Sequence, residues 1–474
     1  MPNPRQIYLL DPQKLPPETI AVAFAKTSRS PESFRQIAAE LSEEKSAQFH
    51  EKWVVGYGHS SVAEHAVLHI AVENVSRLAV ETLESCRLAS YTEKSTRYQK
   101  WKNDEFYIPA ELENHPLRET YTQTVSGLFE AYQNALPKVQ QVVAARIPHK
   151  PNESDEAWER RVRSEIVDAC RFFLPAAALA NVGVSMNARV LEHTIKKMLS
   201  HELDEVRQMG EQIKQVSQQT APTLVKYAEA DPRFETLQEK LKQIAGQVPG
   251  EPTHAADWCK LAHYDQNAED RALAAALYRF NNNDYTHNIR HINSLTFPQK
   301  QDLAAIILAD LGRHDIPLRE LEYASYTFDL TLDQGAYFEF KRHRMMTQTA
   351  QPLTTRLGYA VPRLLVDAGV ESSYKAAMHA AADVYEQLYR YNPAVASYVV
   401  PNGFNRRVLF NMNLRSADHL INLRTAPNAH FSIRRVAQRI AEEIRKVTPL
   451  LGLHLRCCSD ETWQQIEQDY FSEV

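Results

Sequence analysis

Two clusters of polar side chains, about 250 residues apart, carry the clearest chemical signal in this chain. Arg342-His343-Arg344 places two guanidinium groups around an imidazole, and Ser95-x-Arg97 adds a hydroxyl and a third guanidinium. Guanidinium groups stay charged and bind phosphate in a bidentate manner. Either cluster alone is more typical of a solvated surface or an ion-paired helix. Together they predict a site for an anionic ligand, shared between the two halves of the chain.

Composition restricts where such a site can lie. The chain has 474 residues, enough for two or three domains with separate cores, and its content of charged and apolar residues is that of a globular protein. A formal net charge of −5 and a pI near 6.4 argue against general binding to nucleic acid or to a membrane surface, which needs a dominant basic face. The anion site is therefore expected to be local.

No segment reads as a signal peptide or a membrane anchor. Met1–Glu18 lacks the order of basic and then apolar residues, and five prolines interrupt it. The longest apolar run, Phe172–Met186, is too short to span a bilayer. Five scattered cysteines fit a reducing compartment, and the adjacent pair Cys457-Cys458 is expected to be structural. We therefore expect a cytoplasmic protein that binds no membrane.

The chain also shows an internal repeat. An apolar run with strand character, Ala66–Val72 or Tyr323–Leu332, precedes each arginine-containing motif. An Asn-x-Arg triplet follows each motif after a long helical stretch, at Asn187 and at Asn413. The longer first copy predicts an insertion near Ile147–Arg160.

Gly and Pro residues in 246–252 mark the boundary between the copies. Helical patterns dominate, with short strands between them. We predict an α+β protein of two tandem domains, each helix-rich with a small antiparallel sheet. Their expected ranges are 1–232 for the first repeat, 233–260 for a linker and 261–474 for the second repeat.

These motifs resemble those of the flavin-dependent thymidylate synthase family, whose signature is Arg-His-Arg, seven residues, then Ser and Arg. The second repeat keeps Arg-His-Arg but has Pro352 in place of the serine. The first repeat keeps Ser95 and Arg97, whereas Ser85 and Cys86 replace the first arginine and the histidine. The resemblance covers nearly the whole chain as two copies of a thymidylate-synthase-complementing-protein-like domain.

The resemblance implies a division of roles between the repeats. The residues that match flavin-binding positions are Arg342, His343, Arg344, Asn413 and Arg415, with His59, Ser61 and Glu64 from the segment that is similar to the family's His-x-Ser-x-x-Glu-His. The residues that match nucleotide-binding positions are Glu93, Ser95, Arg97, Arg171 and Arg424.

The same resemblance implies the reaction. Family members convert dUMP to dTMP with methylenetetrahydrofolate as carbon donor, NADPH as reductant and bound FAD as the redox cofactor. They are homotetramers with sites between subunits, so a tandem chain is expected to form a homodimer that imitates the tetramer. Arg424 is the candidate for stabilising negative charge on the pyrimidine. Ser95 is expected to be a hydrogen-bonding ligand rather than a nucleophile, with a turn or cap serine as the alternative.

Several features leave alternatives open. Glu339 stands where the family has Gln, and an ionised carboxylate can only accept hydrogen bonds, which would suit a cytosine amino group. A relative that acts on another pyrimidine nucleotide, or a non-catalytic flavin- or nucleotide-binding protein, therefore remains possible. Arg356 could replace Arg97 if its loop carries an insertion. His65 and His69 lack a clear third ligand, so we expect no metal site, and the absence of a glycine-rich phosphate loop argues against a Rossmann site for NADPH.

Overall fold

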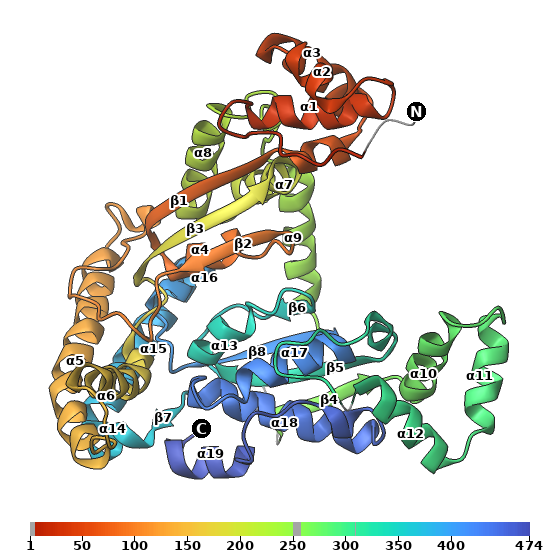
Figure 1. Cartoon of the computed structure of the whole chain (residues 1–474). Helices are drawn as coiled ribbons and strands as arrows, with labels where there is room; N and C mark the ends of the chain where they lie inside the picture. Colours follow the sequence, from red (N-terminus) through yellow and green to blue (C-terminus); the bar gives the residue numbers. More distant parts are fainter. Residues whose placement is uncertain (1–4, 250–256, 309) are drawn as a thin grey trace. The chain divides into compact units, whose positions relative to one another are not determined.

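The computed structural model describes residues 5–249, 257–308 and 310–474 (Figure 1). The predicted linker residues Gly250–Pro252 lie outside the described residues. Two compact units form, and they do not follow the order of the chain. Unit 1 contains 1–94, 105–118 and 177–250, and unit 2 contains 95–104, 119–176 and 251–474. A large part of the first repeat therefore packs with the second repeat in unit 2.

Unit 1 is built on a small antiparallel sheet in the order β1-β3-β2. The strands are β1 (Val67–Ser76), β2 (Ala89–Glu93) and β3 (Leu179–Asn187). Helices α4, α7 and α8 contact this sheet. The helices of unit 1 are α1 (Pro17–Thr27), α2 (Phe34–Ala39), α3 (Glu43–His50), α4 (Arg77–Leu83), α7 (Ala188–Leu199), α8 (Asp204–Gln218) and α9 (Pro232–Ala245), with the short turns η1 (Glu51–Gly56), η2 (Ser60–His65) and η3 (Ala110–Leu112).

Unit 2 contains a second antiparallel sheet, in the order β4-β5-β8-β6, and a two-stranded ribbon of β7 and β9. Its strands are β4 (Cys259–Tyr264), β5 (Ser325–Asp333), β6 (Thr347–Ala350), β7 (Val361–Pro362), β8 (Asn405–Asn413) and β9 (Phe471–Glu473). Its helices up to residue 340 are α5 (Leu117–Arg146, which begins in unit 1), α6 (Asp155–Cys170), α10 (Ala268–Tyr278), α11 (Tyr285–Ser294), α12 (Phe297–Leu308) and α13 (Gln334–Phe340).

The later helices of unit 2 are α14 (Arg363–Asp367), α15 (Glu371–Tyr391), α16 (Pro393–Ala396), α17 (Leu414–Arg424), α18 (Phe431–Val447) and α19 (Trp463–Tyr470). Its short turns are η4 (Arg171–Phe173), η5 (Arg319–Tyr323), η6 (Ser397–Val399) and η7 (Gly452–His454).

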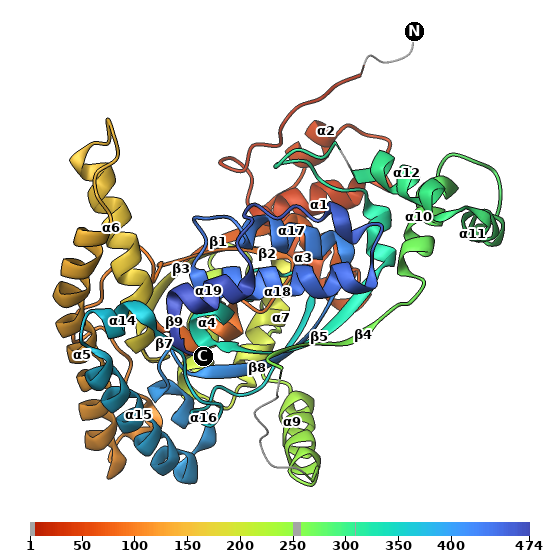
Figure 2. The ribbon, with the colours of Figure 1, turned by 90° about the horizontal axis from the view of Figure 1, so that it is seen from below.

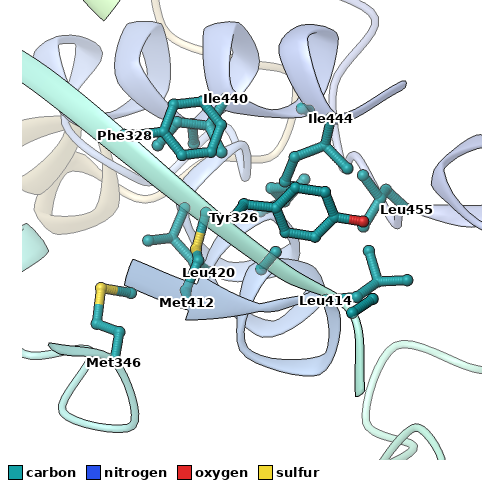
Figure 3. Close-up of a cluster of buried hydrophobic side chains, with 14 of the residues drawn as sticks. Tyr326, Phe328, Met346, Met412, Leu414, Leu420, Ile440, Ile444 and Leu455 are labelled. Atoms are coloured by element: carbon teal, nitrogen blue, oxygen red, sulfur yellow. The ribbon is translucent and has the colours of Figure 1, made fainter. Parts of the chain in front are cut away.

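The core of unit 2 lies between its sheet and helices α17 and α18. Alternate residues of β5 are buried because successive strand residues point to opposite faces. Figure 3 shows Tyr326 and Phe328 of this strand among Ile440 and Ile444 of α18, with Met412 of β8 beside them. The Tyr326 hydroxyl is satisfied inside this core by Thr448 at 2.7 Å. This core supports the helices that carry the candidate site.

The two sheets repeat one another residue by residue. Val67 of β1 lies opposite Asn187 of β3, and Ser325 of β5 lies opposite Asn413 of β8. Each of these asparagines then caps the following helix, because its side chain accepts from a backbone N–H in the first turn. The predicted α+β class with a small antiparallel sheet in each of two tandem domains is confirmed. The strands predicted at Ala66–Val72 and Tyr323–Leu332 correspond to β1 and β5.

Counterpart segments of the two repeats also meet directly inside unit 2. Pro175 pairs with its own counterpart, Pro401, in an antiparallel bridge. Asn402 N donates to Leu174 O, and Ala176 N donates to Val400 O, both at 2.9 Å. Figures 1 and 2 both show α5 and α6 of the first repeat beside α14 and α15 of the second. This bridge ties the segment that carries Arg171 to the second repeat.

Three further predictions concern membrane spans, the insertion in the first repeat and the boundaries of the repeats. In the described ranges 5–249, 257–308 and 310–474, no helix has both the length and the apolar composition required to cross a bilayer. The predicted insertion region, Ile147–Arg160, includes the connection between α5 and α6. The predicted repeat boundaries stay a prediction, since the compact units divide the chain differently.

Close backbone approach at the bridge predicts a sensitive glycine. A Cβ atom on Gly403 would lie 2.1 Å from the Tyr374 hydroxyl and 3.4 Å from Phe172 O. Gly403→Ala should therefore lower the free energy of unfolding by about 1–3 kcal/mol. Gly127→Ala in α5 is the control, since a Cβ there meets nothing within 4 Å and helix propensity improves. Urea titrations of both variants test this, and equal stability of the two variants would contradict it.

Candidate functional site

Arg171 is the most deeply buried charge of the predicted site. It follows α6, which begins after the capping residue Ser154, and it opens the turn η4. Its side chain is 2% exposed. One terminal nitrogen lies 3.4 Å from Glu339 Oε1, and the other donates to Gly335 O at 3.1 Å. Burial lowers the pKa of Arg171, because removal of water disfavours the charged form.

Glu339 connects this arginine to a second one. It lies on α13, a short helix capped by Asp333, whose carboxylate accepts from Ala336 N at 2.8 Å. While Oε1 faces Arg171, Oε2 accepts from Arg424 Nη1 at 3.0 Å. The Glu339 side chain is 6% exposed. Both oxygens of this carboxylate are therefore engaged by arginines, one from each repeat.

Arg424 is held from two sides. It is the last residue of α17, and besides its bond to Glu339 its Nε donates to His343 Nε2 at 2.9 Å. Burial, followed by the charge of Arg424, lowers the pKa of His343 well below its ordinary value. His343 is therefore the neutral imidazole, with Nε2 as an acceptor and the proton on Nδ1. The guanidinium of Arg424 keeps partial exposure, 18%, which allows it to meet a ligand.

Arg97 joins the same region through α6 and the loop that follows α17. Its guanidinium forms a bidentate pair with Asp168, at 2.8 and 2.7 Å, and donates to Asn428 O at 3.0 Å. Burial acts to lower the pKa of Arg97, but the hydrogen bonds and charge of Asp168 outweigh it and raise this pKa. Asp168 precedes Arg171 by three residues on the same helical face. Three predicted nucleotide-binding arginines, at 97, 171 and 424, thus belong to one region of unit 2.

Ser95 occupies a local turn. Its hydroxyl accepts from the backbone N–H of Arg97 at 3.1 Å. This is the geometry of the turn serine that the sequence left open as an alternative. Glu93, the other residue of this motif, belongs to unit 1 and forms a buried ion pair with Arg77 at 3.1 Å. Both of these side chains have local structural partners.

Arg415, a predicted flavin-binding residue of the second repeat, is bonded to a residue that lines a large cavity. Arg415 donates to Glu322 at 2.7 Å and to Pro317 O at 3.1 Å. Glu322 lines a cavity of about 1150 Å³ between α10, α11 and η5. Arg342 is exposed and Arg344 is half-buried in the turn that contains His343. The cavity lining also includes three tyrosines and three arginines, namely Tyr278, Tyr285, Tyr323, Arg271, Arg279 and Arg319.

Unit 1 contains the counterpart of this arrangement. His59, Ser61 and Glu64 line a cavity of about 730 Å³, and Glu64 pairs with Arg189 at 2.5 Å. This pair occupies the position of Glu322 and Arg415 in the second repeat. His59, Ser61 and Glu64 thus line the cavity of unit 1. In unit 2, Arg415 reaches the cavity through Glu322, and Arg342, His343, Arg344 and Asn413 are not among its lining residues.

The counterparts of His343 and Arg424 differ in chemistry. In unit 1, Lys197 Nζ lies 3.9 Å from Cys86 Sγ, and the Cys86 thiol lies 3.0 Å from the Thr194 hydroxyl. Burial lowers the pKa of Lys197. A thiol replaces the imidazole. The alignment of Asn187 with Asn413 puts the buried Met198 at the position of Arg424, and Lys197 beside it brings an ammonium group near the thiol.

Sequence reasoning missed two acidic partners. Asp168 could have been found from its helical spacing to Arg171. The pairing of Glu339 with Arg171 could have been inferred by comparing the repeats. The residues at the counterpart positions, Thr82 and Ser397, are both neutral, so the two charges occur together or not at all. Arg356, the alternative to Arg97, instead forms a bidentate pair with Glu386 at 2.8 and 3.0 Å.

Comparison with known proteins agrees with the two-copy architecture. The model of the thymidylate synthase complementing protein family matches residues 9–223 and again residues 260–450. The chain belongs to this family. A UPF0159 protein of Chlamydia muridarum is 31% identical over 430 residues, which cover 86% of this chain and 80% of that protein. A UPF0159 protein of Thermoplasma acidophilum is 28% identical over 448 residues, covering 87% and 89% of the two chains.

Relatives with a functional name match only part of the chain. A flavin-dependent thymidylate synthase of Clostridium tetani is 28% identical over 213 residues, which cover 45% of this chain but 82% of that protein. One from Thermococcus onnurineus is 31% identical over 192 residues, covering 40% of this chain and 68% of that protein. A relative that spans less than half of this chain corresponds to one family domain, in agreement with the duplication.

The Arg171–Glu339 pair predicts strong coupling between the repeats. Glu339→Thr should lower the free energy of unfolding by about 3–5 kcal/mol, because Arg171 loses its buried counter-charge. The double variant Arg171→Ser/Glu339→Thr restores the neutral residues found at the counterpart positions. It should be more stable than the sum of the single effects predicts, by about 1–3 kcal/mol. Urea unfolding of the four proteins measures this coupling, and additive effects would refute it.

The neutral state of His343 predicts a pH dependence of stability. The unfolded chain takes up a proton near the ordinary histidine pKa of about 6.5, whereas folded His343 resists protonation. Stability should therefore fall as the pH drops below that value, by up to about 1.4 kcal/mol per pH unit for this residue. His343→Gln retains a hydrogen-bond acceptor for Arg424 but has no group that titrates in this range. The free energy of unfolding of this variant should therefore fall less between about pH 7 and about pH 5.

Urea unfolding at both pH values provides the measurement. His430 is also buried, and burial lowers its pKa, so some pH dependence should persist in the variant. Identical losses in the wild type and in His343→Gln would show that His343 does not stay neutral in the folded protein.

Proposed function

We propose that this protein is a flavin-dependent thymidylate synthase that methylates dUMP to dTMP. It would use FAD as cofactor, methylenetetrahydrofolate as carbon donor and NADPH as reductant. The observation that supports this most directly is the cluster of Arg97, Arg171 and Arg424 with Glu339 and His343. It combines residues of both repeats within unit 2.

The charge balance of this cluster favours an anionic ligand. Three arginines face two carboxylates, Asp168 and Glu339, which leaves one positive charge in excess. Burial is the main cause of the lowered pKa of both His343 and Arg424, and the charge of Arg342 lowers both further, which shows that it adds positive charge to the cluster. Arg171 Nε is a buried donor without a hydrogen-bond partner. A nucleotide monophosphate supplies the negative charge and the acceptors that this set lacks.

The large cavity of unit 2 fits the flavin. Aromatic side chains at its rim offer flat apolar surfaces for ring systems, and Tyr278 and Tyr323 are 51% and 52% exposed. Its arginines can meet the phosphates, while the paired Glu322 and Arg415 provide fixed polar groups at one end. We assign FAD to this cavity. Arg342, His343, Arg344 and Asn413 remain predicted flavin contacts and do not line it. His59, Ser61 and Glu64 remain predicted contacts in unit 1.

In the mechanism, bound FAD supplies the redox chemistry and the protein orients the pyrimidine. Arg424 is held by Glu339 and by the neutral His343, so its guanidinium is fixed before the substrate arrives. A fixed donor stabilises negative charge that develops on a ring oxygen at little reorganisation cost. His343 accepts a hydrogen bond from Arg424 and so holds this arginine in place. Because His343 is neutral, it adds no second positive charge that would compete with Arg424 for the anion. Ser95 and Arg97 would orient the phosphate.

A second candidate, a relative that acts on another pyrimidine nucleotide, is favoured by one observation. Glu339 is a carboxylate in place of the family's amide, and both of its oxygens face arginines. An ionised carboxylate accepts hydrogen bonds, which would suit the amino group of a cytosine ring. A cytosine amino group would have to replace one of these arginines at Glu339 in order to bind there.

The flavin assignment predicts a difference between two matched arginines. Arg415→Ala removes the partner of Glu322 beside the unit 2 cavity and should weaken FAD binding about tenfold or more, which is about 1.4 kcal/mol. Arg189→Ala removes the counterpart partner of Glu64 in unit 1 and should retain FAD. Titration of each apoprotein with FAD, followed by visible absorbance, gives both affinities. Loss of FAD in Arg189→Ala alone would place the flavin in unit 1.

Anaerobic turnover tests the reaction itself. The NADPH-reduced protein is mixed with methylenetetrahydrofolate and either dUMP or dCMP, and the nucleotide products are analysed. Formation of dTMP from dUMP supports the leading proposal, and methylation of dCMP supports the second candidate. FAD binding without any methylated product would contradict both and leave a non-catalytic flavin-binding protein.

A further inference from the structure

The sheet of unit 2 has an edge strand that the sheet of unit 1 lacks. In unit 2, β4 lies antiparallel to β5, with Tyr264 opposite Tyr326 and Leu261 opposite Phe328. In unit 1, the strand that corresponds to β5 is β1. Among the described residues, β1 pairs with β3 and with no other strand. The other edge of β1 therefore presents backbone N–H and C=O groups to solvent. In unit 2, β4 pairs with this edge of β5.

The counterpart of β4 is present in the chain as an exposed arm, residues Arg5–Leu10. Asp11 follows the arm and accepts from the N–H two residues later at 3.0 Å, as Asp265 does after β4, also at 3.0 Å. Helix α1 then follows, as α10 follows β4. Ile7 and Leu9 of the arm are 90% and 94% exposed. The arm thus has the position and the apolar residues of a strand without a sheet.

The open edge of β1 matches the arm in length. The register of β1 is interrupted between Val72 and Val75, where Asn74 adopts a positive φ of 58°. Regular edge geometry therefore runs from Leu68 to Val72, which suits an arm of six residues that carries the same single irregularity as β4. Transfer of the β4 register places Leu10 opposite Leu68, Leu9 opposite His69 and Ile7 opposite Ile70.

The base of the arm is anchored on its own chain, while residues 5–7 are exposed. Leu10 packs against the small cluster of Ala23, Ile37 and Ala38, and the Arg35 guanidinium stacks on Tyr8 at 4.1 Å. The connection to α1 contains Pro12 and ends at Pro16, whose φ of −54° and ψ of 150° are extended. The equivalent connection after β4 is shorter and has no proline. Figure 2 shows the arm leading away from α1 and α2.

We propose that the arm of one chain adds to the β1 edge of a second copy of this chain. Exchange of an identical strand between two copies closes both open edges and brings Ile7 against Ile70, and it is a common route to symmetric dimers. Proline in the hinge favours the extended connection that exchange requires. The inference goes beyond the proposed reaction and does not depend on it.

Disulfide trapping between two different cysteine variants tests this pairing. Purified Leu9→Cys protein is mixed with purified His69→Cys protein under a glutathione redox buffer and run on a non-reducing gel. Because the two cysteines lie on different chains, a covalent dimer requires the arm of one chain on β1 of the other. Most of the protein should cross-link, and the product should revert to monomer on reduction.

Two controls define the outcome. The mixture of Leu9→Cys with Glu73→Cys, which lies beyond the register break, should give no more dimer than the wild-type chain with its native cysteines. The double variant Leu9→Cys/His69→Cys tests the same contact within one chain. An internal disulfide in the double variant without dimer in the mixture would overturn the proposal, because the arm would then pair with its own β1. Absence of both disulfides would overturn it as well.

Hydrogen exchange provides a readout without substitution. The backbone amides of Leu68–Val72 on the open edge should be protected in the dimer and should exchange faster when dilution produces monomer. Deletion of the arm should abolish that protection while the amides of β3 remain protected. Fast exchange at every concentration would contradict the proposal.

Discussion

The structure of unit 2 depends on a buried ion pair between a guanidinium of the first repeat and a carboxylate of the second. Arg171 and Glu339 are 2% and 6% exposed, so neither charge can rely on water. Burial of either partner without the other would cost several kcal/mol. The segment that delivers Arg171 is therefore bound to the second repeat, and the backbone bridge at Pro175 and Pro401 continues the same contact. The division into units follows these contacts rather than the order of the chain.

Duplication explains why this pair could arise. In a symmetric pair of identical domains, each copy would carry both charges. Here the first repeat has Arg171 and the neutral Thr82, while the second has Glu339 and the neutral Ser397. Cys86 likewise stands at the position of His343. The two repeats have diverged into complementary parts, so unit 2 carries the arginine cluster and unit 1 carries a thiol with a neighbouring lysine.

Much of this organisation could be predicted from the sequence, because its signals are local or repeated. The alternation in β5 predicted a strand, and the structure contains it. The Asn-x-Arg triplets indicated a repeat, and they occupy equivalent positions at the ends of β3 and β8. Membership of the family followed from motifs that each repeat keeps in part. The grouping of Arg97 and Arg171 with Arg424 was also predicted from this partition.

The remaining features depend on contacts between distant residues, which no local pattern encodes. Ser95 was expected to bind substrate, yet its hydroxyl accepts from a neighbouring N–H in a turn. Glu93 was assigned to the nucleotide, whereas it neutralises Arg77 in unit 1. Glu339 was recognised as a departure from the family, but its two arginine partners could not be seen without the fold. Linear spacing also gave no sign that 119–176 leaves the first repeat to pack in unit 2.

We propose that residues of both repeats form one nucleotide site in unit 2. A crystal structure of the protein with bound dUMP would locate this site. The phosphate should lie beside Arg97 of the first repeat while the pyrimidine ring meets Arg424 of the second, with Glu339 still between Arg171 and Arg424. A nucleotide that contacts residues of a single repeat, or that binds in unit 1 beside Cys86 and Lys197, would contradict it.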